Sequence, residues 1–280
     1  MARPEVDSSR QPLAFVTMVR GDHAMLARWI DHHARLADGR EAPHVIAHGA
    51  DPHTAAPAQG CSLVVLPYDP WVMRSSRGVR ACSSALSRRC GDIIAMSSPS
   101  TPTSFSSSTR RWGWTLAPVS IPCRFRGVAL SPLGFDVIHR PSVEPEPIDW
   151  SRPFTLQRRH GCLHVAYSKP CIFRARPGKG GNQHRLTGQP WQIDPRIMLL
   201  HMRYMDRDWS AEVGRRRMDS VAAFDASGGT HRIGTWADRD VRLAEAIARI
   251  EASDCPELTA ADRSRFANRQ SRLYEERGEV

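Results

Sequence analysis

Two charged side chains follow the first apolar run of the chain, in a position where they could contact a ligand. Residues 13–19 read LAFVTMV, a short run that predicts a buried strand, and Arg20 and Asp22 come directly after it. In α/β proteins, ligands bind at the edge of the sheet where the parallel strands end. The alternative for Asp22 is purely structural, because its carboxylate could cap a helix that starts there.

A second pair, His48 and Asp51, follows the next strand candidate in the same way. Residues 44–47 (HVIA) form this candidate, and residues 62–66 (SLVVL) form a third. Parallel strands end at one edge of their sheet, so we expect these side chains near that edge. His48 and Asp51 are therefore candidates for ligand contact, and simple turn residues are the alternative.

Helical patterns follow the first strand and return near the C-terminus. Apolar residues recur at helical spacing after Asp22, and Gly39 stands just past the end of that pattern. Residues 238–250 predict a second amphipathic helix. Thr259, with Asp262 three positions later, predicts the capping box of a third.

The second half of the chain contains three further extended patterns. Residues 134–139 (GFDVIH) predict a strand, residues 165–176 look extended, and residues 197–205 are strongly apolar. Strands and helices in alternation predict one α/β domain with a helical C-terminal extension.

One segment does not resemble the rest of the chain. Residues 74–126 hold 13 Ser, 9 Arg and 3 Cys but only one acidic residue, Asp92. Its net charge of +8 accounts for most of the +10 of the whole chain. We expect this segment to be the least regular part of the protein, because so few apolar residues cannot offset the entropy of ordering the backbone.

Composition excludes several classes of protein. A chain of 280 residues with 41% apolar residues can bury a core, which argues against global disorder. A pI near 9.9 often indicates a nucleic-acid partner, but here the excess charge is local and is not interleaved with aromatic residues, so a nucleic-acid surface is not expected. The seven Cys form no CxxC pair, and no apolar run approaches the length of a membrane span. We expect a soluble cytoplasmic protein.

Several segments carry a resemblance to a known family. They are FVTMVRGDHAMLARWIDHH (15–33), VIAHGADPHT (45–54), GFDVIHR (134–140), SKPCIFR (168–174), GNQHR (181–185) and LLHMRYMD (199–206). In this order they resemble bacterial glycosyltransferase family 2-like proteins of the GT-A type. The resemblance covers about 13–73 and 128–206, and each motif alone is weakly specific.

The resemblance implies a GT-A-like, Rossmann-like mixed sheet over residues 13–206. A disordered N-terminus at 1–12 would precede it, and a helical extension at 207–280 would follow it. The implied activity transfers a sugar from a nucleotide-sugar to an acceptor that the sequence does not identify. The donor diphosphate would be bound with a divalent cation, Mg²⁺ or Mn²⁺, held by carboxylates at the end of a strand.

The resemblance also implies roles for four residues of the second half. Lys169 and Arg174 would meet diphosphate oxygens, with a place on a solvated edge as the alternative. His184 would lie near the metal and the diphosphate, although a lone His after a Gly-rich turn is often a surface residue. His201 is a second candidate near the metal, and a hydrogen-bonded core residue is the alternative.

The acidic centre of such a site is absent from this sequence. The Asp-x-Asp-type motif should fall near residues 95–108, which read AMSSPSTPTSFSSS and contain no carboxylate. We therefore expect the sheet to lack the strand that carries the motif, which would leave a gap or an exposed edge.

A pair of compensating frameshifts would explain both the missing motif and the composition. They would enter near residues 71–80 and leave near residues 122–131. Off-frame reading of GC-rich coding DNA produces Ser, Arg, Pro and Cys. With suitable codons assumed for 98–110, the alternative frame reads close to TEHADE[F/L]LVVDP, an acidic strand-end motif.

The sequence supports three hypotheses about function. The first is a glycosyltransferase-like protein that is impaired because its metal carboxylates are missing. The second treats residues 74–126 as an Arg/Ser-rich insert that binds RNA or another polyanion through its charge. The third is a non-catalytic scaffold that keeps only the fold.

Overall fold

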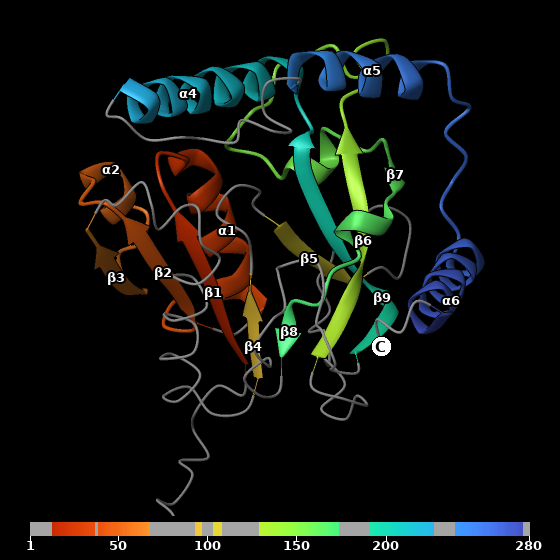
Figure 1. Ribbon diagram of the computed structural model, residues 1–280, viewed down its shortest axis with the longest axis horizontal. Helices are drawn as coiled ribbons and strands as arrows, with labels where there is room; N and C mark the ends of the chain where they lie inside the picture. Colours follow the sequence, from red (N-terminus) through yellow and green to blue (C-terminus); the bar gives the residue numbers. More distant parts are fainter. Residues whose placement is uncertain are drawn as a thin grey trace, which may run out of the picture.

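The computed structural model describes residues 13–36, 39–67, 93–96, 103–107, 129–173, 191–226 and 239–276. These residues form a mixed α/β fold in which nine strands make one sheet and helices lie beside it (Figure 1). The mixed α/β class expected from the sequence is confirmed. The N-terminal residues 1–12 and most of 74–126 lie outside the described residues.

The N-terminal half alternates strands and helices. The elements are β1 (Leu13–Val19), α1 (His23–Leu36), β2 (Pro43–His48), α2 (Pro52–Ala55) and β3 (Ser62–Leu66). β1 pairs in parallel with β2, and β2 pairs in parallel with β3, so this part forms the parallel unit predicted from the sequence.

The remaining strands come from the middle and second half of the chain. They are β4 (Ile93–Met96), β5 (Thr103–Ser107), β6 (Ala129–Ile138), β7 (Gly161–Leu163), β8 (Ile172–Phe173) and β9 (Trp191–Tyr204). The strand order across the sheet is β3-β2-β1-β4-β8-β6-β9-β5, and β7 pairs with β6 off this path.

The expectation that the sheet lacks the strand leading into residues 95–108, and so has a gap there, is wrong. β4 lies between β1 and β8, parallel to the first and antiparallel to the second. β5, from the same Ser/Arg-rich segment, pairs antiparallel with β9. Strand pairing joins backbone groups, which every residue except proline can supply, and the run Ile93–Met96 is apolar enough to enter a sheet.

The extended pattern predicted at 165–176 is only partly present. Residues Val165–Tyr167 form a 3₁₀ turn, η3, and only Ile172–Phe173 pair as a strand. β6 and β9 are longer than their predicted cores at 134–139 and 197–205. β6 and β9 run side by side in parallel, with register shifts along the pair.

The helices of the C-terminal part pack against the sheet. They are α4 (Arg207–Ala226), α5 (Arg239–Glu251) and α6 (Ala260–Glu276). Leu243 and Ile250 of α5 share a core cluster with Ile138 and Tyr204. Ala267 of α6 packs with apolar residues of β6, β8 and β9. In Figure 1, α4 and α5 lie along the end of the sheet to which the arrows of β6 and β9 point.

The predicted start of the last helix is confirmed in detail. Thr259 N donates to Asp262 Oδ2 at 3.2 Å, and Asp262 N donates to Thr259 Oγ1 at 3.1 Å. These reciprocal bonds are a capping box, which satisfies two backbone donors that the first turn of a helix leaves unpaired.

The core between α1 and the sheet is built from residues of segment 15–33, the first of the segments that carry the family resemblance. Trp29, Ile30 and His33 are buried together with Phe15 of β1. His33 Nδ1 bonds to the Trp29 carbonyl at 2.7 Å, and its ring meets Phe15 edge-on at 4.5 Å. The aromatic and His positions of this motif are therefore packing residues.

Among the described residues, no helix combines the length and the apolar character needed to cross a bilayer. Their four cysteines, Cys61, Cys162, Cys171 and Cys255, are free thiols.

Candidate functional site

The strands that carry the predicted site residues end at one edge of the sheet. β1, β2, β3, β4, β6 and β9 run in one direction, and β5, β7 and β8 run in the other. From β1 the chain first builds outward through β2 and β3, and then returns to place β4 on the other side of β1. α/β proteins bind ligands at such a switch point, beyond the carboxyl ends of the strands. The edge formed by the ends of β1 and β4 is therefore the candidate site.

The turn after β1 lies at this switch point. Arg20 is exposed and Asp22 is half-buried. The Asp22 carbonyl accepts from Leu26 N at 2.9 Å, so Asp22 directly precedes the first turn of α1, as predicted. Gly21 has a φ of 65°, a conformation that favours glycine. Arg216 of α4 donates from Nη1 to the Gly21 carbonyl at 2.5 Å, which brings a further cation to the edge.

The turn after β2 carries the second predicted pair. His48 is buried at the end of the strand. Asp51 caps α2, accepting from His53 N at 3.0 Å and from Thr54 Oγ1 at 3.0 Å, and its carboxylate lies 3.5 Å from His23 Nε2. Slight desolvation acts to raise the pKa of Asp51, but the hydrogen bonds from Thr54 and His53 outweigh it and lower this pKa. Asp51 thus has a structural role as a helix cap.

Lys169 enters the same edge from the other direction. Because β8 is antiparallel to β4, with Ile172 opposite Ala95, the chain before β8 lies where β4 ends. β8 is two strands from β1, and strands are spaced about 4.8 Å apart, so roughly 10 Å separates Lys169 from the turn after β1.

The side chain of Lys169 is buried without a counter-ion in the described part of the chain. It is 4% exposed, and no hydrogen bond or ion pair to its ammonium group occurs among the described residues. Burial lowers the pKa of Lys169, because the charged form loses hydration. An anion placed here would restore the lost electrostatic stabilisation.

His201 pairs with an acidic residue that the sequence did not single out. His201 Nδ1 lies 2.8 Å from Asp136 Oδ1, and both side chains are buried. The ring of Tyr167 stacks on His201 with centroids 3.5 Å apart. A histidine oriented by a carboxylate at Nδ1 presents Nε2 to its other side, as in many metal and acid–base sites.

The Asp136 carboxyl can hold a proton near neutral pH. Burial raises the pKa of Asp136 to about 7, and the positive charges of His164, Arg203 and Arg249 only partly oppose this. The bond to His201 Nδ1 gives this buried carboxyl a polar partner, so the two side chains hold each other in place between β6 and β9.

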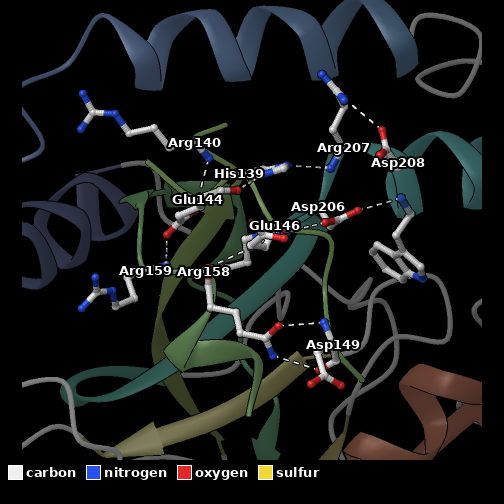
Figure 2. A network of polar contacts seen from close by, with 12 residues as sticks. His139, Arg140, Glu144, Glu146, Asp149, Arg158, Arg159, Asp206, Arg207 and Asp208 are labelled. Carbon is white, nitrogen blue, oxygen red and sulfur yellow. Dashed lines mark hydrogen bonds and ion pairs between the residues drawn. The ribbon is translucent and has the colours of Figure 1, made fainter. Parts of the chain in front are cut away.

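A buried polar network lies beyond the ends of β6 and β9 (Figure 2). Arg158 Nη2 donates to Asp206 Oδ2 at 2.5 Å. Glu144 accepts from Arg159 N at 2.7 Å and lies 2.8 Å from His160 Nδ1. These contacts hold the loop between β6 and β7 against the start of α4.

The same network fixes the direction of α4. Trp209 N donates to Asp206 Oδ1 at 2.9 Å, and Arg207 N donates to His139 Nδ1 at 3.1 Å. The first turn of α4 is thus tied to β6 and β9, and Arg216, further along the helix, reaches the turn after β1. α4 therefore links the ends of β6 and β9 to the turn after β1.

Two predicted site residues, Arg174 and His184, lie outside the described residues. Among the residues that are described, no group of three or more His, Cys, Asp or Glu side chains is arranged to hold a metal ion. His201 and Asp136 form a pair of such side chains, one fewer than a set of three. The described part of the chain therefore supplies no set of metal ligands in place of the carboxylates absent from residues 95–108.

The structure places three of the eight predicted site residues at the switch-point edge, and it shows three further residues that were not predicted. Arg20, Asp22 and Lys169 lie at the switch-point edge, and His201 lies two strands beyond Lys169. Asp136, Tyr167 and Arg216 were not predicted. An acidic residue inside the apolar run 134–139 was the available signal for Asp136, since a buried carboxyl needs a partner.

Comparison with known proteins adds no identity: no protein-family model matches the chain, and no curated protein matches it.

Proposed function

We propose that this chain is a glycosyltransferase family 2-like protein of the GT-A type that binds a nucleotide-sugar at the switch-point edge of its sheet. The observation that carries the proposal is the convergence of two separate segments on that edge. Arg20 and Asp22 follow β1, and Lys169 precedes β8, on the other side of β4. The edge is also where α/β proteins bind nucleotides.

The chemistry of the edge suits a diphosphate. Lys169 offers a buried ammonium, and Arg20 and Arg216 add guanidinium groups beside the turn after β1. Charge-assisted hydrogen bonds from such groups are the usual ligands of phosphate oxygens. They would stabilise the charge that develops on the diphosphate when its bond to the sugar breaks.

The residues present do not supply the metal site that the resemblance implies. Residues 95–108 contain no carboxylate, and Asp51 caps a helix. No step of the proposal therefore uses a metal ion. We expect the polypeptide to bind the donor and to transfer sugar slowly or not at all.

The test is donor turnover by the full chain. Common nucleotide-sugars are incubated with the protein and Mn²⁺ or Mg²⁺, and released nucleoside diphosphate is measured. Binding without robust turnover is the expected result, and Lys169→Ala should lose binding. Robust metal-dependent turnover would contradict the expectation that transfer is slow or absent. Failure of every nucleotide-sugar to bind would overturn the proposal itself.

The gene sequence tests the origin of the impairment. Two compensating frameshifts around 74–126 would account for the missing motif, and the alternative frame should encode an acidic strand-end sequence. A polypeptide made from the restored frame should turn over donor with Mn²⁺. An intact reading frame in the re-sequenced gene would eliminate this explanation.

The charge of the same segment favours a second candidate function. Nine Arg and one acidic residue within 74–126 would give salt-sensitive binding to RNA or another polyanion, with little dependence on sequence. Filter binding with single-stranded RNA at low salt separates the two functions. Absence of binding eliminates the second candidate and leaves the first unaffected.

A further inference from the structure

η3 lies directly against β6, and the contact depends on a glycine. A Cβ atom at Gly134 would lie 2.2 Å from the Tyr167 carbonyl carbon and 2.4 Å from Ser168 N, which are backbone atoms that cannot turn aside. Gly134 N donates to Ser168 Oγ at 2.9 Å, and His164 N donates to the Gly134 carbonyl at 2.9 Å. Both backbone groups of Gly134 therefore hold the turn in place.

The turn is fixed a second time by its aromatic side chain. The Tyr167 ring stacks on the His201 imidazole with planes inclined by 17°, and Asp136 orients that imidazole through its bond to Nδ1. His201 and Asp136 are 3% and 5% exposed, so water does not compete for their bond. Tyr167 rests on a rigid surface formed by β6 and β9.

Lys169 follows this turn immediately. Its backbone N–H donates to the Tyr167 carbonyl at 2.9 Å, and two residues later Cys171 N donates to the Leu130 carbonyl at 3.3 Å. The backbone of Lys169 is therefore held between the η3 turn and the attachment of Cys171 to β6. Its place at the edge depends on where Tyr167 lies.

We infer that Asp136, His201 and Tyr167 are positioning residues that hold Lys169 at the edge of the sheet and thereby set the affinity of the anion site. The inference rests on the proposed function, which assigns Lys169 to the diphosphate. It extends that function to a cluster on β6, η3 and β9 that is not itself assigned to the diphosphate.

The physical reason is the short range of the contact. A hydrogen bond from an ammonium group to a phosphate oxygen needs about 2.7–2.9 Å between the atoms, so a displacement of roughly 1 Å removes most of it. Loss of the ring under Tyr167, or of the ring of Tyr167 itself, would allow such a displacement while the sheet stays folded.

The experiment measures the dissociation constant of UDP by calorimetry for the full chain and matched variants. Tyr167→Leu removes the stacking ring, and Tyr167→Phe keeps it. His201→Gln removes the partner ring but keeps a hydrogen-bonding group. Trp150→Leu is the control, because Trp150 packs edge-on against Trp209, with ring centroids 5.9 Å apart, and is not one of the residues that hold the turn.

We expect Tyr167→Leu and His201→Gln to weaken UDP binding by about tenfold, and Tyr167→Phe and Trp150→Leu to stay within about twofold of the natural chain. Circular dichroism and thermal melts show which variants fold. If one of the two weakening variants fails to fold, the other decides.

The outcomes separate the inference from the proposed function. If Lys169→Ala loses affinity while folded Tyr167→Leu and His201→Gln bind normally, the positioning role is overturned and the proposed function stands. If Lys169→Ala binds normally, the anion site is elsewhere. If the natural chain does not bind UDP, both fail. Loss of affinity in Trp150→Leu equal to that in Tyr167→Leu also overturns the positioning role, because a general loss of stability would then explain the effect.

Discussion

Arg158 and Asp206 form an ion pair with almost no access to water. Their side chains are 2% and 6% exposed, and Asp206 also accepts from the backbone N–H of Trp209 at the start of α4. The pair thus joins the loop after β6 to the helix that crosses the candidate site. A buried charge of this kind is strongly destabilising when its partner is removed.

We expect Arg158→Met to lower the free energy of unfolding by about 3–5 kcal/mol, because Asp206 would be left buried without a cation. Urea unfolding followed by tryptophan fluorescence measures the change. Arg207→Met is the matched control, since Arg207 pairs with Asp208 at an exposed position, 60% and 77% accessible. Equal destabilisation by the two variants would contradict the assigned role of the buried pair.

Acid should destabilise the protein partly through His33. Burial, and to a smaller degree the neighbouring His32, hold the pKa of His33 well below its usual value, although the bond to the Trp29 carbonyl opposes this. The unfolded chain then binds a proton below its ordinary pKa of about 6.5, while the folded chain does not. Stability from this residue is therefore present above pH 6.5 and is lost as the pH falls.

The measurement compares urea unfolding of the natural chain and of His33→Gln at several pH values from about 7.5 to 5. The variant should be less stable at neutral pH and should lose less stability on acidification. Asp136 contributes with the opposite sign, because its pKa is raised to about 7, so its stabilisation is lost as the pH rises toward that value. A variant with the pH slope of the natural chain would show that His33 is not the titrating group.

Two glycines allow a test of close packing against backbone strain. Gly134→Ala should cost about 2 kcal/mol or more, because the new methyl group meets the backbone of η3. Gly21→Ala meets no atom within 4 Å, so only its φ of 65° opposes the substitution, at a cost of about 1 kcal/mol. Thermal melts of both variants check the order, and a larger loss at Gly21 would argue against the tight contact at Gly134.

Nucleotide binding should not depend on a metal ion in this chain. The dissociation constant of UDP should be the same with EDTA and with Mn²⁺, because residues 95–108 offer no carboxylate and the proposed contact of Lys169 with phosphate needs no metal ion. Calorimetry with and without Mn²⁺ is the measurement. A tenfold or greater gain in affinity with Mn²⁺ would reveal a metal site formed by other residues.

Much of the fold was predictable because its elements follow simple periodic patterns. The run LAFVTMV forms β1 with the predicted bounds, and the capping box at Thr259 marks the start of α6 within one residue. Both signals are local: one is a row of apolar side chains, and the other is a pair of polar side chains three positions apart. Tertiary context was not needed to recognise them.

The errors came from features that depend on distant partners. β4 was not expected, since its segment is rich in Ser and Arg, yet its few apolar residues pair with β1 and β8. η3 was read as extended because nothing near it in the sequence shows that Gly134 lies against it. Asp136 was overlooked for the same reason, because His201, its partner, is 65 residues away.

The packing of α5 and α6 on β6 and β9 has a consequence for synthesis of the chain. The apolar side chains of Ile138 and Tyr204 are covered by Leu243 and Ile250 of α5, and β6 is also contacted by α6. A ribosome makes the strands well before it makes these helices. Nascent chains that end before residue 239 therefore carry an uncovered apolar surface on the sheet, and they are the species that a chaperone would be expected to hold.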